Sequence, residues 1–167
     1  MSRRAIRVIG IDPGLASTGW GIVDIQGNRD RHVAHGVIRT SPAASVGERL
    51  LKIHTEIDTV IAEYAPTEAG VENLYFARNA TSAIPVAQAR GVVLLALTQR
   101  QVPAHEYPPQ AIKQAIVGSG RAEKYQVQEL VRMLLGLESA PRPDHASDAL
   151  AAAICHIAHR GAPEGGR

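Results

Sequence analysis

The sequence predicts one α/β domain in which helices cover a mixed β-sheet. The N-terminal part of the chain holds three strand-like segments with no helix between them, which is typical of an antiparallel meander. After residue 45, helical and strand-like segments alternate, which is typical of βαβ units with parallel strands. A chain of 167 residues is long enough for one domain with a substantial hydrophobic core.

The three N-terminal strands are expected where apolar residues run together or alternate with polar ones. A turn follows the first strand at Pro13-Gly14, and the polar segment 26–30 is expected to be a hairpin loop. The expected strands cover residues 5–12, 19–25 and 32–39.

The apolar residues adopt a helical period after residue 45. A helix over 46–64 would place one apolar face inward and end before Pro66. That face consists of Val46, Leu50, Ile53, Ile57, Val60, Ile61 and Tyr64. The later expected elements are strands over 67–72 and 102–107 and helices over 79–100, 109–117, 123–135 and about 144–160.

The ends of these elements suggest capping residues and a domain boundary. Asn79 and Thr81 are N-cap candidates for the helix over 79–100, and Asp144 is the candidate for the last helix. We expect residues 1–160 to form a single domain and residues 161–167 to be a disordered tail.

The composition favours a soluble globular protein of the cytoplasm. Hydrophobic residues make up 45% of the chain, which excludes a disordered class. No apolar run is as long as a membrane span, and the N-terminus does not resemble a signal peptide. Cys155 is the only cysteine, so no internal disulfide can form. A net charge of +2 is too small to argue for a polyanionic partner.

Three carboxylates, Asp12, Glu72 and Asp148, each adjoin an apolar run. An acid at the end of a buried strand is costly unless something pairs with it, and three acids together would repel one another. A divalent cation such as Mg²⁺ or Mn²⁺ resolves this conflict. The pattern therefore predicts metal-assisted phosphoryl chemistry. Taken alone, Asp12 could instead form the turn at Pro13, and Glu72 could be a solvated acid.

The start of the last expected helix adds a fourth candidate. Asp148 can share a helical face with Asp144 or with His145. The helix dipole favours acids in the first turn, so Asp144 is explained as a cap. A protonated His145 gains nothing there, which favours a role for His145 in the site.

Two further groups are candidates for binding nucleic acid. Tyr75 and Phe76 could stack on unpaired bases, with Arg78 and Asn79 beside them to hold phosphate. The alternative for the two aromatic residues is core packing. Lys113, Arg121 and Lys124 flank Gly118-Ser119-Gly120, a turn whose N–H groups could bind phosphate. Taken alone, an ordinary solvated turn explains this segment better.

Six motifs, in this order, resemble the RuvC family of bacterial Holliday junction resolvases over roughly residues 6–158. They are Ile9–Gly14 with Thr18–Gly21, Val71–Asn79, Gln88–Gly91, Lys113–Gly118, Ala122–Lys124 with Gln126–Gln128, and Asp144–Leu150.

The resemblance implies an RNase H-like fold with a mixed five-stranded sheet. It also implies a homodimer that nicks two strands of a four-way DNA junction symmetrically and leaves ligatable ends with 5′-phosphates. Two Mg²⁺ or Mn²⁺ ions per site and cooperation with the branch-migration proteins RuvA and RuvB are implied as well. By resemblance, Asp12, Glu72 and Asp148 match the catalytic acids, Tyr75 a residue that stacks at the crossover, and Lys113 and Lys124 DNA contacts.

The sequence departs from the family pattern at one position. The fourth catalytic position falls on His145, where many members carry Asp. We therefore expect a mixed site of three acids and one histidine, and a nitrogen ligand would favour Mn²⁺ over Mg²⁺.

Two other functions fit the sequence less well, and one helix is a candidate dimer interface. A sugar-kinase or actin-like ATPase would need a second phosphate motif and a longer chain. A non-catalytic DNA-binding relative would not need the acids. The helix over 79–100, with Val92 to Leu97, is a candidate dimer interface, although the same residues could be core.

Overall fold

A computed structural model describes residues 5–74 and 80–161. Five strands form one sheet in the order β3-β2-β1-β4-β5. The β1–β2 and β2–β3 pairs are antiparallel, whereas β1–β4 and β4–β5 are parallel, so the predicted mixed sheet is confirmed. The strands are β1 (Ile6–Asp12), β2 (Ser17–Gln26), β3 (Arg29–Arg39), β4 (Glu68–Glu72) and β5 (Ala104–Tyr107).

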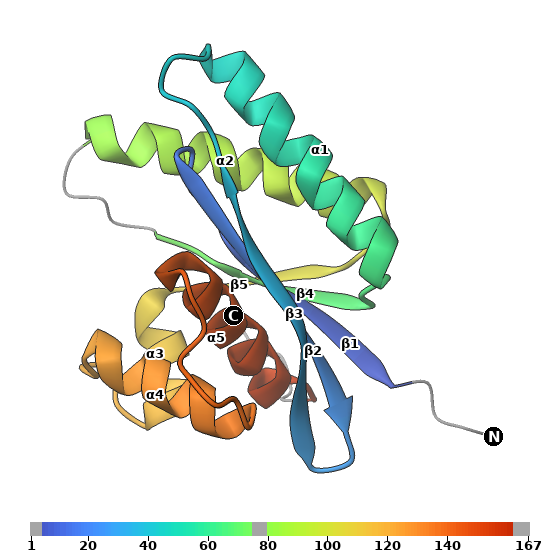
Figure 1. Cartoon of the computed structure of the whole chain (residues 1–167), viewed down its shortest axis with the longest axis vertical. Coiled ribbons are helices and arrows are strands. Elements are labelled where there is room, and N and C mark those ends of the chain that lie inside the picture. Colours follow the sequence, from blue (N-terminus) through green and yellow to red (C-terminus); the bar gives the residue numbers. More distant parts are fainter. Residues whose placement is uncertain (1–4, 75–79, 162–167) are drawn as a thin grey trace, which may run out of the picture.

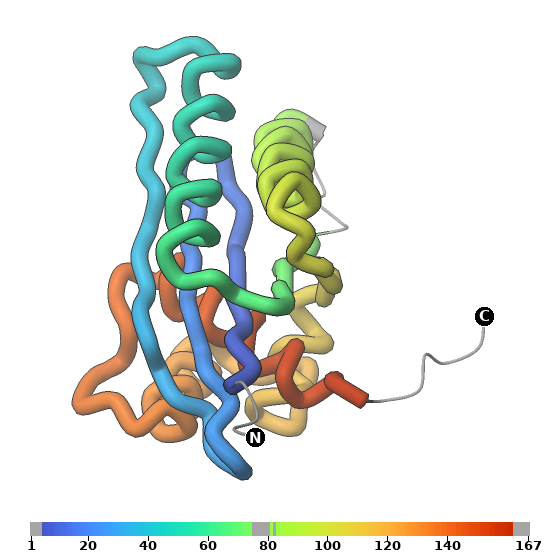
Figure 2. Tube along the Cα trace, turned by 90° about the vertical axis from the view of Figure 1, so that its right-hand side faces the viewer, coloured from blue at the N-terminus to red at the C-terminus, as the bar shows by residue number. Residues whose placement is uncertain are grey.

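Helices cover both faces of the sheet (Figure 1). On one face α1 and α2 lie side by side, as Figure 2 also shows. On the other face α5 lies next to the sheet, with α3 and α4 beside it. The helices are α1 (Val46–Tyr64), α2 (Ala80–Gln99), α3 (Pro109–Val117), α4 (Lys124–Leu134) and α5 (Asp144–His159).

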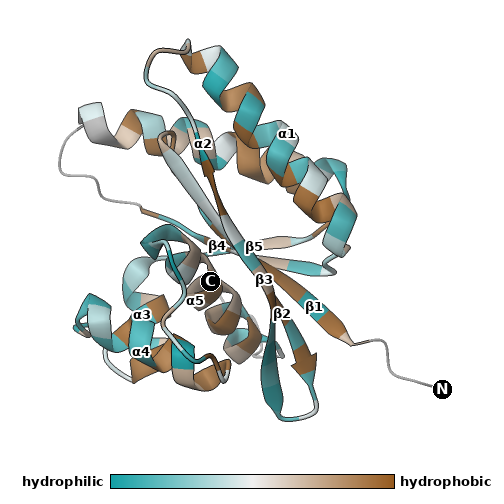
Figure 3. Cartoon of the chain, in the orientation of Figure 1, coloured by the Kyte–Doolittle hydropathy of each residue, from teal (hydrophilic) through white to brown (hydrophobic). Residues whose placement is uncertain are grey.

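Each face of the sheet has its own hydrophobic core. Ile9, Ile11 and Val71 point toward α1 and α2, whereas Val8 and Val23 point toward α3, α4 and α5. This alternation is the period of two that strands impose. Figure 3 shows the matching pattern on α1, where hydrophobic and hydrophilic bands alternate along the helix. The predicted inner face of α1 is largely confirmed, with Ile53, Ile57, Val60 and Ile61 buried.

Helix α5 packs directly on the centre of the sheet because glycines there leave room for its backbone. A Cβ atom at Gly10 would overlap the carbonyl oxygen of Ala149, and one at Gly19 would overlap that of His145. Gly19 pairs with Asp12 in the β1–β2 register. The close contact at Gly19 therefore places the first turn of α5 beside the end of β1.

The structure corrects two predictions about element ends. The hairpin turn between β2 and β3 consists of two residues, Gly27 and Asn28, and not of residues 26–30. Gly27 has a φ of +60°, which a two-residue hairpin requires and glycine tolerates. The N-cap of α5 is Pro143, so Asp144 is the first helical residue and not the cap.

The remaining predictions concern the N-cap of α2 and the C-terminal tail. Thr81 already lies inside α2, so it is not the N-cap. The other candidate, Asn79, lies outside the described residues, and so do residues 162–167 of the predicted tail. The single domain over 1–160 and the disordered tail stay predictions.

Candidate active site

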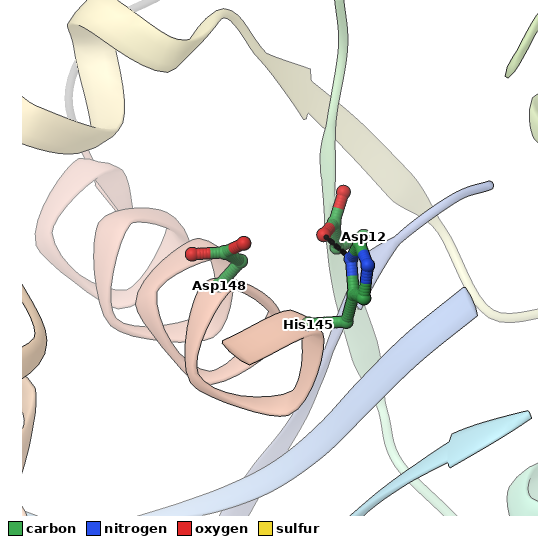
Figure 4. A group of neighbouring side chains, drawn as sticks. All are labelled: Asp12, His145 and Asp148. Carbon is green, nitrogen blue, oxygen red and sulfur yellow. Dashed lines mark hydrogen bonds and ion pairs between the residues drawn. The ribbon is translucent and has the colours of Figure 1, made fainter. Parts of the chain in front are cut away.

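Three of the predicted site residues converge where β1 ends and α5 begins. Asp12 is the last residue of β1, and His145 and Asp148 lie on the first turns of α5. One ligand atom from each residue lies within 4.8 Å of the others. Figure 4 shows His145 and Asp148 on one helix, with Asp12 on the strand beside it. Residues that are 133 positions apart in sequence thus form one cluster.

His145 is tied to Asp12 by a hydrogen bond. The Nδ1 atom of His145 lies 3.0 Å from Oδ2 of Asp12, which is buried. This hydrogen bond raises the pKa of His145, and it does so against the opposing effect of burial. The contact orients the imidazole relative to the carboxylate, and both groups carry atoms that can ligate a divalent cation.

Glu72, the fourth predicted residue, is held next to Asp12 by strand pairing. Ile11 of β1 is the parallel partner of Val71 in β4, so the next residue on each strand lies at the same edge of the sheet. Burial raises the pKa of Glu72, and the charge of Asp12, a hydrogen bond with Asp12 and the charge of Asp148 raise it further. The crowding of carboxylates is a conflict that a bound cation would relieve.

The donor set fits a divalent metal ion. Carboxylate oxygens and an imidazole nitrogen are suitable ligands for Mg²⁺ or Mn²⁺, and the cluster comes from two rigid elements. Burial and the charge of Asp12 raise the pKa of Asp148, whereas Lys124 and His145 act in the opposite direction. A bound cation would relieve the remaining conflict among the acids.

Lys124 supplies the positive charge that the site does contain. Its Nζ atom lies 3.5 Å from Oδ2 of both Asp148 and Asp144. Burial lowers the pKa of Lys124, but the charges and hydrogen bonds of the two acids outweigh this effect and raise it. Asp144 also accepts a hydrogen bond from Nε2 of Gln128, at 3.2 Å, and its exposed side chain lies at the rim. The family resemblance implied a DNA contact for Lys124, and its contact with the acids was not predicted.

A cavity of about 240 Å³ adjoins the acids and has an apolar floor. Lys113 lies in its wall, so both predicted lysines are at the site. The sequence analysis did not predict the apolar floor of this cavity, although the apolar faces of α3 and α4 could have indicated it. The lining residues are Glu72, Leu74, Pro109, Ile112, Lys113, Lys124, Val127, Asp148 and Ala151.

Arg121, another predicted DNA contact, is exposed in the turn before α4. Within residues 5–74 and 80–161, its side chain makes no hydrogen bond or ion pair with the acids. Tyr75, Phe76, Arg78 and Asn79 lie outside the described residues. These five residues stay predictions.

Residues 8–156 match the family profile described as crossover junction endodeoxyribonuclease RuvC. The chain belongs to the RuvC family. The resemblance on the six motifs is thereby confirmed, and the match covers both β1 with Asp12 and α5 with His145 and Asp148.

Proteins named crossover junction endodeoxyribonuclease RuvC are similar over almost the whole chain. The RuvC protein of Treponema denticola is 57% identical over 150 residues, which are 90% of this chain and 84% of that protein. The RuvC protein of Heliobacterium modesticaldum is 51% identical over 148 residues, 89% of this chain and 91% of the relative.

Solved structures show the same fold. The structure of Thermus thermophilus RuvC in complex with a Holliday junction substrate has a TM-score of 0.88 and 39% identity, and covers 92% of this chain and 94% of its own. The yeast mitochondrial Holliday junction resolvase is 10% identical with a TM-score of 0.63, covering 92% of this chain and 79% of its own, and supports the fold alone. The predicted RNase H-like fold of the RuvC family is thus confirmed.

One exclusion concerns membranes. Among the helices within residues 5–74 and 80–161, none combines the length and the hydropathy needed to cross a bilayer.

Proposed function

We propose that this RuvC-family protein is an endonuclease that resolves four-way DNA junctions by hydrolysing one phosphodiester bond in each of two strands. The observation that carries this proposal is the convergence of Asp12, His145 and Asp148, with Glu72 at the same edge of the sheet. Membership of the RuvC family supports the substrate, since a relative 39% identical is described in complex with a Holliday junction.

The three clustered residues, together with Glu72, would hold two divalent ions, Mg²⁺ or Mn²⁺. Asp12 would be shared between the ions, and Glu72, His145 and Asp148 would complete the ligand set. Metal ions in such a site activate the attacking water and stabilise the charge that develops on the phosphate oxygens. The support is the donor chemistry and the unrelieved repulsion among the acids.

The chain's own residues would orient the ligands and admit the DNA. The hydrogen bond between His145 and Asp12 holds the imidazole in place, and the contact of α5 with Gly19 fixes the backbone at this point. Bare acids would repel a phosphodiester. Lys113 and Lys124 lie in the wall of the adjoining cavity and offset that charge. When a cation neutralises Asp148, the ammonium group of Lys124 would pair with a DNA phosphate instead of with this acid.

Further DNA contacts belong to the same proposal. Tyr75 and Phe76 would stack at the open centre of the junction, and Arg78, Asn79 and Arg121 would bind phosphates. The support for Tyr75, Phe76, Arg78 and Asn79 is their place in the sequence directly after Leu74, which lies in the cavity wall.

A homodimer would provide one active site for each strand. The support is the apolar surface of α2 and α1. Ile84 is 58% exposed, Leu95 is 52% exposed and Leu51 of α1 is 66% exposed. Contiguous apolar patches mark interaction sites in soluble proteins, and these exposed side chains are candidates for such a patch. Val93 and Leu97, in the predicted interface segment, are buried in the core, so only part of that segment is available. Action in the cytoplasm together with RuvA and RuvB completes the proposal and rests on family membership.

The function is tested with synthetic four-way junctions and linear duplexes of the same sequence, incubated with Mg²⁺, Mn²⁺ or EDTA. We expect symmetric nicks in the junction with either metal, ligatable ends with 5′-phosphates, and no cleavage in EDTA. Equal cleavage of junction and duplex would instead indicate a general nuclease. Cleavage in EDTA would overturn the metal centre.

A further inference from the structure

Asn73, the residue after Glu72, is buried and held by two hydrogen bonds. It is 4% exposed. Its backbone N–H donates to the carbonyl oxygen of Tyr107 at 2.8 Å. Its side-chain Nδ2 donates to Oε1 of Glu106 at 3.1 Å. The chain is therefore fixed immediately beyond the end of β4, where a strand would otherwise fray.

Glu106 is in turn held by Arg90. The Nε atom of Arg90 donates to Oε1 of Glu106, and Nη2 donates to Oε2 at 2.7 Å. A bidentate pair of this kind fixes the carboxylate in both position and orientation. Arg90 lies on α2 and Glu106 on β5. Asn73, which follows β4, is thus linked directly to β5 and, through Glu106, to α2.

This network lies on the opposite face of the sheet from the acids. Val71 is the partner of Glu106 in the β4–β5 register, and Val71 belongs to the core beneath α1 and α2. Because side chains alternate along a strand, Glu72 points to the other face, toward Asp12 and Asp148. None of Asn73, Glu106 and Arg90 belongs to the lining of the cavity beside the acids.

We propose that Asn73, Glu106 and Arg90 form a positioning network that holds the carboxylate of Glu72 at the metal centre through its backbone. The proposal rests on the proposed function, because it takes Glu72 to be a metal ligand. The acids repel Glu72, and it occupies the last residue of its strand. Strand pairing holds Glu72 from within β4, and the contacts of Asn73 hold the chain directly beyond it. Groups that orient a metal ligand typically change metal affinity or activity about 10- to 100-fold when they are removed.

The alternative is that these contacts only stabilise the fold. The chain provides a matched control in Asp58 and Arg100, which form the same kind of bidentate pair at 2.6 and 2.8 Å. That pair joins α1 to the end of α2 and lies in neither β4 nor the site. Removing it should cost stability without changing the metal dependence.

The experiment compares Asn73→Ala, Glu106→Ala and Glu106→Gln with Asp58→Ala in the full chain. Single-turnover cleavage of a four-way junction is measured against Mn²⁺ concentration, and junction affinity is measured in EDTA. We expect Asn73→Ala and Glu106→Ala to lower the maximal rate and raise the half-saturating Mn²⁺ concentration, each by about 10- to 100-fold. Junction affinity should not change, and Asp58→Ala should change neither value.

Two comparisons keep the test decisive. Glu106→Gln preserves the shape of the side chain and one acceptor oxygen. It should therefore raise the half-saturating Mn²⁺ concentration less than Glu106→Ala does, and it can be measured even if the alanine variant does not fold. The double variant of Asn73→Ala and Glu106→Ala should cost less than the product of the single effects, because the two residues act as one unit. Unchanged half-saturation in these variants, or equality with Asp58→Ala, would overturn the positioning role.

Glu72→Gln separates this inference from the proposed function. If Glu72→Gln still cleaves junctions, the metal centre itself is wrong. If Glu72→Gln is inactive while the network variants behave like Asp58→Ala, the proposed function stands and only the positioning role fails.

Discussion

The Nδ1 atom of His145 lies 3.0 Å from Oδ2 of Asp12, and this contact links the first turn of α5 to the last residue of β1. In a RuvC-family protein with an acid here, two carboxylates would face each other and repel. With a histidine, the same contact is a hydrogen bond in the absence of a metal. The substitution therefore changes both the charge of the site and the softness of one ligand.

The first prediction concerns the metal preference that follows from this histidine. The wild-type chain should cleave junctions faster with Mn²⁺ than with Mg²⁺, because imidazole suits the softer ion better. His145→Asp should shift the preference toward Mg²⁺. Single-turnover rates in each metal at saturating concentration provide the measurement. Equal rates for the wild type would contradict the role of His145 as a metal ligand.

The second prediction concerns the packing of α5 on β2. Gly19→Ala should lower the free energy of unfolding by at least about 1–3 kcal/mol, because the new Cβ would overlap the carbonyl oxygen of His145. It should also reduce cleavage, since α5 must shift. Urea unfolding measures the stability change. Gly91→Ala in α2 is the control, because its Cβ meets no atom within 4 Å, and it should stabilise the chain by about 0.5–1 kcal/mol. Similar values for both variants would contradict the close packing of α5.

The third prediction concerns acid stability, which depends on contacts at the other end of α5. Nε2 of His156 lies 2.7 Å from Oε2 of Glu68, and Arg160 binds both carboxylate oxygens at 2.7 Å. The hydrogen bond from Arg160, together with that from His156, lowers the pKa of Glu68 from 4.5 to about 2. Burial lowers the pKa of His156 below 6.5.

Both shifts act in the same direction with pH. Glu68 contributes stability that is fully present above pH 4.5 and is lost as the pH falls toward 2. His156, buried as the neutral form, also loses its contribution as the pH falls below 6.5. Glu68→Gln should therefore be less stable than the wild type at pH 7, and the difference should shrink below pH 4.5. Glu63→Gln, at an exposed position of α1, is the control, and its stability difference should stay small at both pH values. A constant difference between pH 7 and pH 3 would contradict the assignment.

The fourth prediction concerns Lys124 and the charge of the site. Lys124→Met should weaken junction binding and reduce the slope of log affinity against log salt by about 1, because one phosphate contact is lost. Lys52→Met is the control, because Lys52 lies on α1 and contacts Glu56 at 3.9 Å. Fluorescence anisotropy with a labelled junction between about 50 and 200 mM salt measures both slopes. Identical slopes for the two variants would show that Lys124 serves only the acids.

The sequence predicted elements best where local signals were strong. The bounds of α1 and α3 agree with the predicted 46–64 and 109–117. In α1 the apolar period is regular, and Ser45 and Glu48 cap its start. In α3, Pro109 begins the helix and Gly118 ends it with a φ of +85°. Local chemistry alone determines such ends.

Other features depended on contacts that are distant in sequence. The length of the β2–β3 hairpin follows from cross-strand pairing over its full length, which an alternating pattern does not define. The contact of Lys124 with Asp148 requires α4 to pack beside α5. The acids could be predicted because burying them is costly, whereas Glu106 carries no such signal, since its importance depends on Arg90 and Asn73 lying nearby.

The central claim is that Asp12 and its neighbours cut junctions by holding a divalent metal. The most direct test measures how the variant Asp12→Asn cleaves and binds a four-way junction in the presence of Mn²⁺. We predict that cleavage is abolished, while binding stays intact or improves because one negative charge beside the phosphates is gone. Cleavage by Asp12→Asn at the wild-type rate would contradict the account.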